Sequence, residues 1–214
     1  MFFLMRIIFL SLFILCSAGL MAQPSLSLKV YPAFSSNRVE TSSDTLRLTD
    51  DGSGLRFGVS LVADFPMTEN YYFTTGISYI AKKSGLVVLN RNTSQVSKQV
   101  TNVRYVQIPV SLKLYTNELS LDTRFYFQIG ALAEFKVGEN DVEGNAEIIE
   151  DYGFFDTSLL FAAGAERKLG TTTAAYVGIS YQRGLIDIIN DTARIDGDLT
   201  MKNSLIGLEV GLRF

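Results

Sequence analysis

Apolar and polar residues alternate along eight long stretches of the chain, and this period of two is the feature that most constrains the fold. In "LRFGVSLVADF", residues 55–65, every second residue is apolar, and the residues between them include Arg56, Ser60 and Asp64. Successive side chains of a β-strand point to opposite faces, so this pattern predicts strands with two different environments. The predicted strands cover residues 26–34, 54–65, 71–83, 101–115, 124–137, 154–168, 172–183 and 203–214.

The lengths of these stretches and of the segments between them favour a membrane protein. Most can supply the roughly 9–11 tilted residues that a strand needs to cross a bilayer. The connections alternate between long and short, which is typical of an up-and-down barrel with short periplasmic turns and long outer loops. They cover residues 35–53, 66–70, 84–100, 116–123, 138–153, 169–171 and 184–202. We therefore expect an all-β, eight-stranded antiparallel up-and-down transmembrane β-barrel with its N- and C-termini in the periplasm.

The two faces of the predicted strands differ in a way that favours lipid outside the barrel. A secreted lipocalin-like barrel would turn its apolar face inward around a ligand. In this chain one face is almost continuously apolar, with aromatic residues towards its ends, while the other mixes glycine, serine and charge. The membrane barrel is the favoured interpretation, and the lipocalin-like barrel is the alternative.

The polar face is expected to fill the lumen. An eight-stranded barrel is about wide enough to hold its own side chains. We expect a lumen network in which glutamates balance lysines and an arginine, so that the barrel conducts poorly; a narrow ion path is the alternative. The residues of this network are Lys29, Arg56, Lys113, Glu134, Glu166 and Glu209.

The N-terminus has the layout of a signal peptide. Residues 7–15 form an apolar run after a single charge at Arg6, and the small residues Ser17, Ala18, Gly19 and Ala22 follow. We expect cleavage after residue 22, with cleavage after Gly19 as the alternative, and a barrel domain over residues 23–214. Cys16, the single cysteine of the sequence, lies inside this segment, so the exported domain has no thiol.

The last predicted strand ends on Phe214 after an alternating apolar pattern that includes Val210 and Leu212. We expect these three residues to face lipid and to act as an assembly signal that the barrel-insertion machinery reads. Outer-membrane lipid and this machinery are therefore expected partners.

Catalytic and metal chemistry find little support in the sequence. The chain has no histidine, so Ser-His catalysis and histidine-ligated metals are excluded. A net charge of −3 gives no basis for binding nucleic acid. We expect a protein that is not an enzyme, with no cofactor and no metal site.

The fourth predicted strand contains "YVQIPVSLKLY", residues 105–115. This stretch resembles the tyrosine, Ile-Pro and lysine pattern of the PorT-type outer-membrane β-barrel family of Bacteroidota, carried here by Tyr105, Ile108, Pro109 and Lys113. Because proline removes one ladder hydrogen bond, Pro109 is also expected to form a β-bulge.

Two classes of function follow. The resemblance implies a scaffold or accessory component of an envelope or protein-secretion machine, with envelope secretion proteins as partners. The alternative is a small-molecule binder or narrow transporter that uses the lumen, since fold alone does not decide function.

Overall fold

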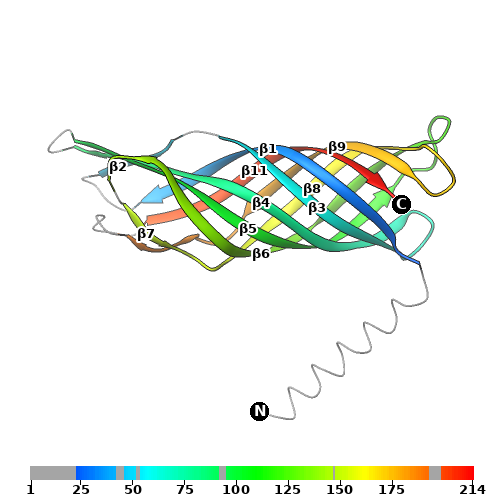
Figure 1. The fold of residues 1–214 in the computed structure, drawn as a ribbon, viewed down its shortest axis with the longest axis horizontal. Coiled ribbons are helices and arrows are strands. Elements are labelled where there is room, and N and C mark those ends of the chain that lie inside the picture. The colour runs from blue at the N-terminus through cyan, green and yellow to red at the C-terminus, as the bar shows by residue number, and fades with distance from the viewer. Residues whose placement is uncertain (1–22, 42–45, 52–53, 92–94, 147, 193–198) are drawn as a thin grey trace, which may run out of the picture.

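The computed structural model describes residues 23–41, 46–51, 54–91, 95–146, 148–192 and 199–214. Within them the chain forms strands throughout (Figure 1). The first six are β1 (Ser25–Thr41), β2 (Leu46–Asp50), β3 (Gly54–Pro66), β4 (Tyr71–Asn90), β5 (Val96–Tyr115) and β6 (Thr123–Gly144). The remaining five are β7 (Ile149–Tyr152), β8 (Phe155–Lys168), β9 (Ala174–Gly184), β10 (Ile189–Thr192) and β11 (Leu199–Arg213).

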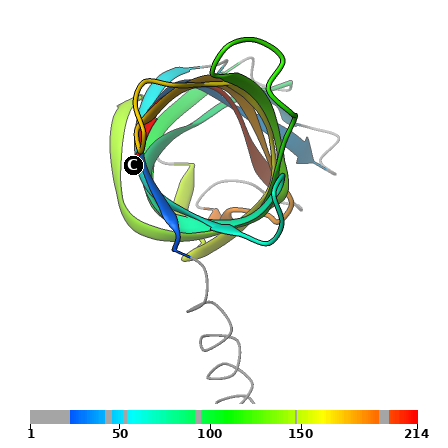
Figure 2. The same cartoon turned by 90° about the vertical axis from the view of Figure 1, so that its right-hand side faces the viewer.

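Eight of the strands close into a ring, in the order β1, β3, β4, β5, β6, β8, β9 and β11 (Figure 2). Every neighbouring pair is antiparallel, and β11 pairs with β1 from Ser27↔Arg213 to Thr41↔Leu199. Within the ring no strand is left at an edge, so backbone groups find partners on both sides, except in extensions such as residues 36–41 and 138–144, which pair with one neighbouring strand. The predicted eight-stranded antiparallel barrel is confirmed.

The strands are longer than the sequence indicates. Residues 35–41, 84–90, 96–100 and 138–144, which were expected in long loops, continue β1, β4, β5 and β6. Ladder hydrogen bonds do not require apolar alternation, so pairing continues beyond the residues that face lipid. The end of the barrel to which these extensions lead is called the long-loop end, and the opposite end the short-turn end.

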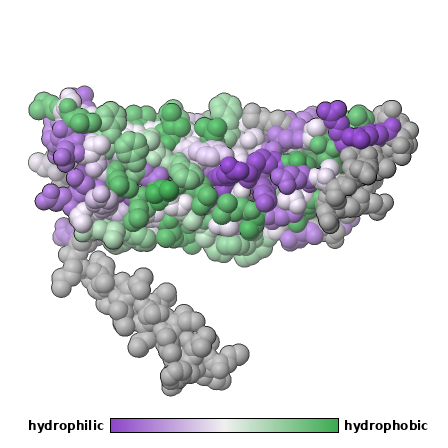
Figure 3. Space-filling model, turned by 180° about the vertical axis from the view of Figure 1, so that it is seen from behind, coloured by the Kyte–Doolittle hydropathy of each residue, from purple (hydrophilic) through white to green (hydrophobic). Residues whose placement is uncertain are grey.

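Exposed apolar side chains lie on every strand of the ring, and the face drawn in Figure 3 shows them as a belt between the two ends. Along β3, for example, Phe57, Val59 and Leu61 are 68%, 51% and 52% exposed, while Ser60 and Asp64, on the opposite face of the strand, are buried. Apolar side chains therefore lie outside and polar ones inside, the reverse of a lipocalin-like barrel.

Pro109 does not form the expected bulge. On β5 the pairs with β4 run from Thr75↔Val110 to Ser78↔Gln107 without a change of register, and Pro109 itself lies opposite Leu132 of β6. The proline removes ladder bonding locally, but no residue is inserted. The irregularities of β5 lie nearer the long-loop end, between Val100 and Thr101 and between Arg104 and Tyr105.

Tyrosine rings cover glycines on the inner wall. A Cβ atom on Gly58 would come within 2.3 Å of the Tyr31 ring, and one on Gly211 within 2.4 Å of the Tyr176 ring. A larger residue would push these rings away from the wall, so the glycines let bulky aromatic side chains fit into a narrow lumen.

A small two-stranded sheet of β7 and β10 lies at the long-loop end, and in Figure 2 it is seen inside the ring of strands. Ile148, Ile149 and Ile188 are buried in an apolar cluster with wall residues such as Leu86 and Met201. This sheet and its flanking residues, 148–152 and 188–192, are called the plug.

Gln99 of β5 holds the plug by its side chain. Its Oε1 accepts hydrogen bonds from the backbone N–H groups of Ile148 and Ile149, at 2.7 and 2.8 Å, and its Nε2 donates to the Ile149 carbonyl at 3.3 Å. The side chain thus pairs with the plug as a neighbouring strand would.

Candidate functional site

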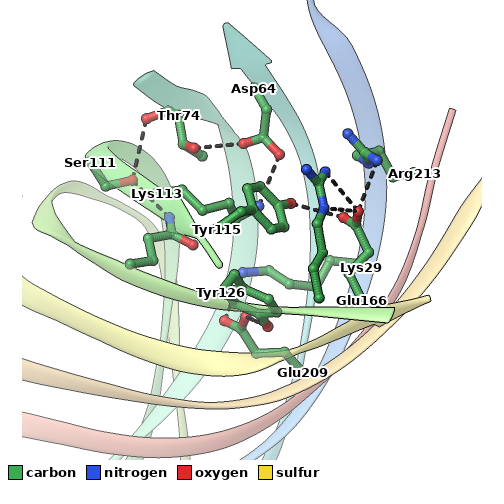
Figure 4. A network of polar contacts seen from close by, with 12 residues as sticks. Lys29, Asp64, Thr74, Ser111, Lys113, Tyr115, Tyr126, Glu166, Glu209 and Arg213 are labelled. Carbon is green, nitrogen blue, oxygen red and sulfur yellow. Dashed lines mark hydrogen bonds and ion pairs between the residues drawn. The ribbon is translucent and has the colours of Figure 1, made fainter. Parts of the chain in front are cut away.

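The lumen is the candidate site, because polar side chains from all parts of the ring converge there. Near the short-turn end Glu166 of β8 is the centre of a cluster (Figure 4). Its Oε1 accepts from Arg124 Nε at 3.0 Å and Arg213 Nη2 at 2.8 Å, and its Oε2 accepts from the Tyr115 hydroxyl at 2.8 Å. The Arg124 guanidinium also lies 3.6 Å from the centroid of the Tyr115 ring. One buried carboxylate therefore holds two arginines and a tyrosine from β5, β6 and β11.

Lys113 lies next to this cluster and is held by Asp64. Its Nζ donates to Asp64 Oδ2 at 2.9 Å, and Thr74 donates to the other oxygen of that carboxylate at 2.5 Å. The Lys113 Nζ also lies 5.3 Å and 5.6 Å from the ring centroids of Tyr126 and Tyr176. Tyrosine faces and one carboxylate together stabilise this buried cation.

Lys29 of β1 pairs with Glu209 of β11. Lys29 Nζ donates to Glu209 Oε1 at 2.8 Å, and the Tyr126 hydroxyl donates to Oε2 at 3.4 Å. Figure 4 shows this pair beside the Glu166 cluster. These contacts extend the network from one side of the lumen to the other.

Towards the long-loop end, Lys82 lies between two carboxylates. It donates to Glu134, and its Nζ is 3.7 Å from Asp156 Oδ2. The Ser158 hydroxyl donates to the second Glu134 oxygen at 2.6 Å. Lys82, Glu134 and Asp156 are almost completely buried, at 1%, 0% and 0% exposure.

Opposite charges balance within the network. Five cations face five carboxylates through the ion pairs of Lys29, Lys82, Lys113, Arg124 and Arg213 with Asp64, Glu134, Asp156, Glu166 and Glu209. The cavity at mid-barrel has a volume of about 20 Å³, enough for about one water molecule. The lumen is thus filled by its own side chains.

The structure places most residues of the predicted lumen network in this interior. One pair forms within the predicted network, since Lys29 binds Glu209. Lys113 binds Asp64 instead, and Glu134 and Glu166 bind cations that do not belong to the predicted network. Arg56 departs from the expected balance, since its Nη2 donates to Asn102 Oδ1 at 2.5 Å rather than to a carboxylate.

Five charged residues of the interior lie outside the predicted network, namely Asp64, Lys82, Arg124, Asp156 and Arg213. The signal for them was present, because each has the same parity along its strand as an inward-facing neighbour. Arg124 and Glu134 are ten residues apart on β6, and Asp156 and Glu166 are ten apart on β8. An even separation places two residues of one regular strand on the same face.

The PorT-like motif lies mostly inside the barrel. Tyr105 is 0% exposed and Lys113 5%, Pro109 lines the mid-barrel cavity, and Ile108 faces outward with 39% exposure. The motif therefore helps to fill the lumen and offers little surface to another protein.

The residues of the expected assembly signal lie on the outer wall. Val210, Leu212 and Phe214 are 45%, 42% and 59% exposed. The Phe214 N–H donates to the Leu26 carbonyl at 2.8 Å, and the Leu26 N–H donates back at 3.3 Å, so β11 stays paired with β1 to the last residue.

Ion pairs also join the strands beyond the apolar belt. Lys83 and Lys98 bind the Asp51 carboxylate with N···O distances of 2.8 and 3.1 Å. Burial alone would raise the pKa of this carboxyl, but hydrogen bonds from the two lysines outweigh it and hold the pKa below its usual range.

No helix in the described part of the chain is long and apolar enough to cross a membrane. No group of three or more Cys, Asp or Glu side chains there has the arrangement of a metal site. The predicted signal peptide, residues 1–22, lies outside the described residues.

A closed antiparallel ring with an apolar outer belt and a charge-balanced interior defines a transmembrane β-barrel. The family model of the outer membrane protein beta-barrel domain matches residues 21–190. The chain belongs to this family and is an outer-membrane β-barrel protein.

Solved structures of other outer-membrane proteins are similar to this chain at low identity. The N-terminal β-barrel domain of Pseudomonas aeruginosa OprF is 10% identical, with 91% of this chain and 100% of that chain covered and a TM-score of 0.44. Neisserial surface protein A is 11% identical, with 90% and 100% covered and a TM-score of 0.49. Ail, the attachment invasion locus protein of Yersinia pestis, is 14% identical, with 90% and 99% covered and a TM-score of 0.41. No curated protein matches the chain.

Proposed function

We propose that this protein is a non-enzymatic barrel whose lumen is closed to solutes, and that it works through its two ends as a scaffold or accessory component of an envelope protein-secretion machine. The single observation that carries the proposal is the filled lumen, with its buried ion pairs and a cavity of about 20 Å³. An ion crossing it would have to separate buried pairs, and leaving one buried charge without its partner costs several kcal/mol.

The proposed orientation places the short-turn end and both termini in the periplasm and the long-loop end at the cell surface. It follows the usual arrangement of outer-membrane barrels, in which the short turns are periplasmic. Outer-membrane lipid, the barrel-insertion machinery and envelope secretion proteins are the proposed partners.

The side chains of the short turns favour a protein partner on the periplasmic side. Each carries an exposed apolar side chain, with Met67 at 64%, Leu121 at 83% and Leu169 at 62% exposure. Leu119, in the same turn as Leu121, is 66% exposed. Apolar side chains grouped at one end of a molecule are typical of a protein-binding surface.

Conductance tests the closed lumen. We expect the purified barrel, folded and inserted in planar bilayers, to give no reproducible single-channel currents. Steady open channels comparable to those of a general porin would reject the closed lumen and favour the transport function instead.

Affinity purification from native membranes tests the scaffold role. We expect envelope proteins to copurify with the wild type and to be lost from a double variant, Leu119→Asp with Leu121→Asp. Val142→Asp, at the long-loop end, is the matched control, since Val142 is also exposed, at 57%. A wild-type barrel that is recovered alone after mild crosslinking would contradict the scaffold role.

A further inference from the structure

The outer wall carries a cationic group where the apolar belt ends on β1 and β11. Phe34 and Ile206, paired across these strands, are 58% and 56% exposed and belong to the belt. The next outward-facing pair towards the long-loop end is Ser36 with Ser204, and the one after it joins Arg38 to Lys202. Two cations are thus directly opposite each other, two steps beyond the lipid-facing residues.

A third cation comes from β9. Arg183 pairs with Ser204 of β11, so it lies diagonal to Lys202 on the same face. Arg38 Nη2 reaches across β11 and donates to the carbonyl of Gly184, the neighbour of Arg183, at 2.6 Å. Arg38, Lys202 and Arg183, which we call the cationic patch, therefore come from three adjacent strands.

The cations of the patch are not neutralised by ion pairs. Among the described residues, none of its three side chains forms an ion pair with a carboxylate. The Nε of Arg38 is buried and has no hydrogen-bond partner there. Glu40, two residues farther along the same face of β1, is exposed and lies diagonal to Lys202, but the two side chains form no ion pair. Like charges directly opposite each other on a sheet are destabilising, so this arrangement favours a bound anion.

The position of the patch indicates which anion fits. It adjoins the lipid belt, where headgroups rather than acyl chains contact the protein. Guanidinium and ammonium groups bind phosphate oxygens strongly, guanidinium as a planar fork. Neighbouring strands are about 4.8 Å apart, so three strands spread the cations over roughly 10 Å. That breadth suits a headgroup with more than one phosphate better than a single phosphodiester.

We propose that Arg38, Arg183 and Lys202 bind the phosphate groups of a phosphorylated glycolipid in the leaflet that surrounds the long-loop end. The assignment of the phosphates to a glycolipid rests on the proposed orientation, which puts the long-loop end in the outer leaflet. Binding would fix the depth of the barrel in the membrane and place ordered lipid against β1, β9 and β11.

Lipid binding to the folded barrel in detergent micelles tests the patch, independently of conductance and of copurification. The probe is diphosphoryl lipid A, with its dephosphorylated form and phosphatidylglycerol as comparisons. A triple variant, Arg38→Gln, Arg183→Gln and Lys202→Gln, should bind the diphosphoryl form roughly 100-fold more weakly than the wild type, since each cation near an anionic lipid contributes about fivefold.

Arg104→Gln is the matched control. Arg104 is an exposed cation on the outer wall of β5, next to the belt residue Val106, and lies away from the patch. The control should bind the diphosphoryl lipid as the wild type does. Equal binding of the dephosphorylated lipid, or an unaffected triple variant, would overturn the phosphate site. Phosphatidylglycerol binding as tight as the diphosphoryl lipid would overturn the glycolipid assignment, as would displacement of the lipid by millimolar inorganic phosphate.

Discussion

At the scale of single residues, the energetics of this barrel depend on buried charges that have no substitute partner. Glu166 is 1% exposed and binds both Arg124 and Arg213, so its loss would remove the carboxylate partner of two arginines at once. The ion pairs beyond the apolar belt differ from this buried cluster, because water solvates both of their members. The carboxylate of Glu143, for example, is 65% exposed where it binds Lys98.

Glu166→Gln should lower the free energy of unfolding by about 3 kcal/mol, because it leaves two partly buried arginines without a carboxylate. Glu143→Gln, which breaks an exposed pair, should cost below about 1 kcal/mol. Urea titrations in lipid vesicles, followed by tyrosine fluorescence and by heat-dependent mobility on gels, measure both. Similar costs for the two variants would contradict the buried network.

Gly211→Ala should destabilise the barrel by about 1–3 kcal/mol, since the new Cβ would overlap the Tyr176 ring and force it into a crowded lumen. Gly170→Ala, in the turn before β9, is the control because a Cβ there meets nothing within 4 Å. The same urea titrations compare the two, and an unchanged stability of Gly211→Ala would mean that the ring has room to move.

At the scale of strands, periodicity predicted the barrel and the facing of most residues, but not where the strands end. The alternation of residues 55–65 reflects two solvents, lipid outside and the polar lumen inside, and it stops where water lies outside the wall. Strand pairing continues there, so β4 extends to Asn90 and β5 begins at Val96, although no sequence pattern indicates these ends. Which residues bind Glu134 and Glu166 depends on the register between neighbouring strands. The pattern along a single strand does not contain that information.

Two arginine substitutions on β6 locate the membrane boundary. Ile129 and Val137 have similar exposure, 52% and 56%, but Ile129 lies within the apolar belt and Val137 lies eight residues nearer the long-loop end. Ile129→Arg should cost about 2–4 kcal/mol and Val137→Arg about 0–1 kcal/mol, because the penalty of a charge depends on its depth in the bilayer.

Folding titrations in vesicles measure the difference between the two variants. Equal costs would mean that the belt extends along β6 beyond Phe135. The same pair of variants in detergent micelles, where depth has no fixed meaning, should differ less and serves as the control.

At the scale of the whole molecule, two groups of side chains fill the interior at different depths. The plug packs against the wall at the long-loop end through apolar contacts, and the charge network fills the middle and the short-turn end. The two groups use different chemistry and share no residue. Loosening one should therefore leave the other intact, which distinguishes a filled barrel from a gated channel.

Gln99→Leu tests this independence. The change removes the side chain that accepts from the Ile148 and Ile149 amides, so hydrogen exchange in β7 should become faster. Hydrogen exchange with mass spectrometry measures this, and Gln182→Leu, which affects a lumen contact with Gln107 instead, is the control. Planar bilayers with the Gln99→Leu protein should stay silent, because Lys82, Lys113 and Glu166 still fill the lumen below. Faster exchange in the plug together with steady currents would contradict this prediction. The plug would then be the gate of a channel, and ions would be able to pass through the charge network.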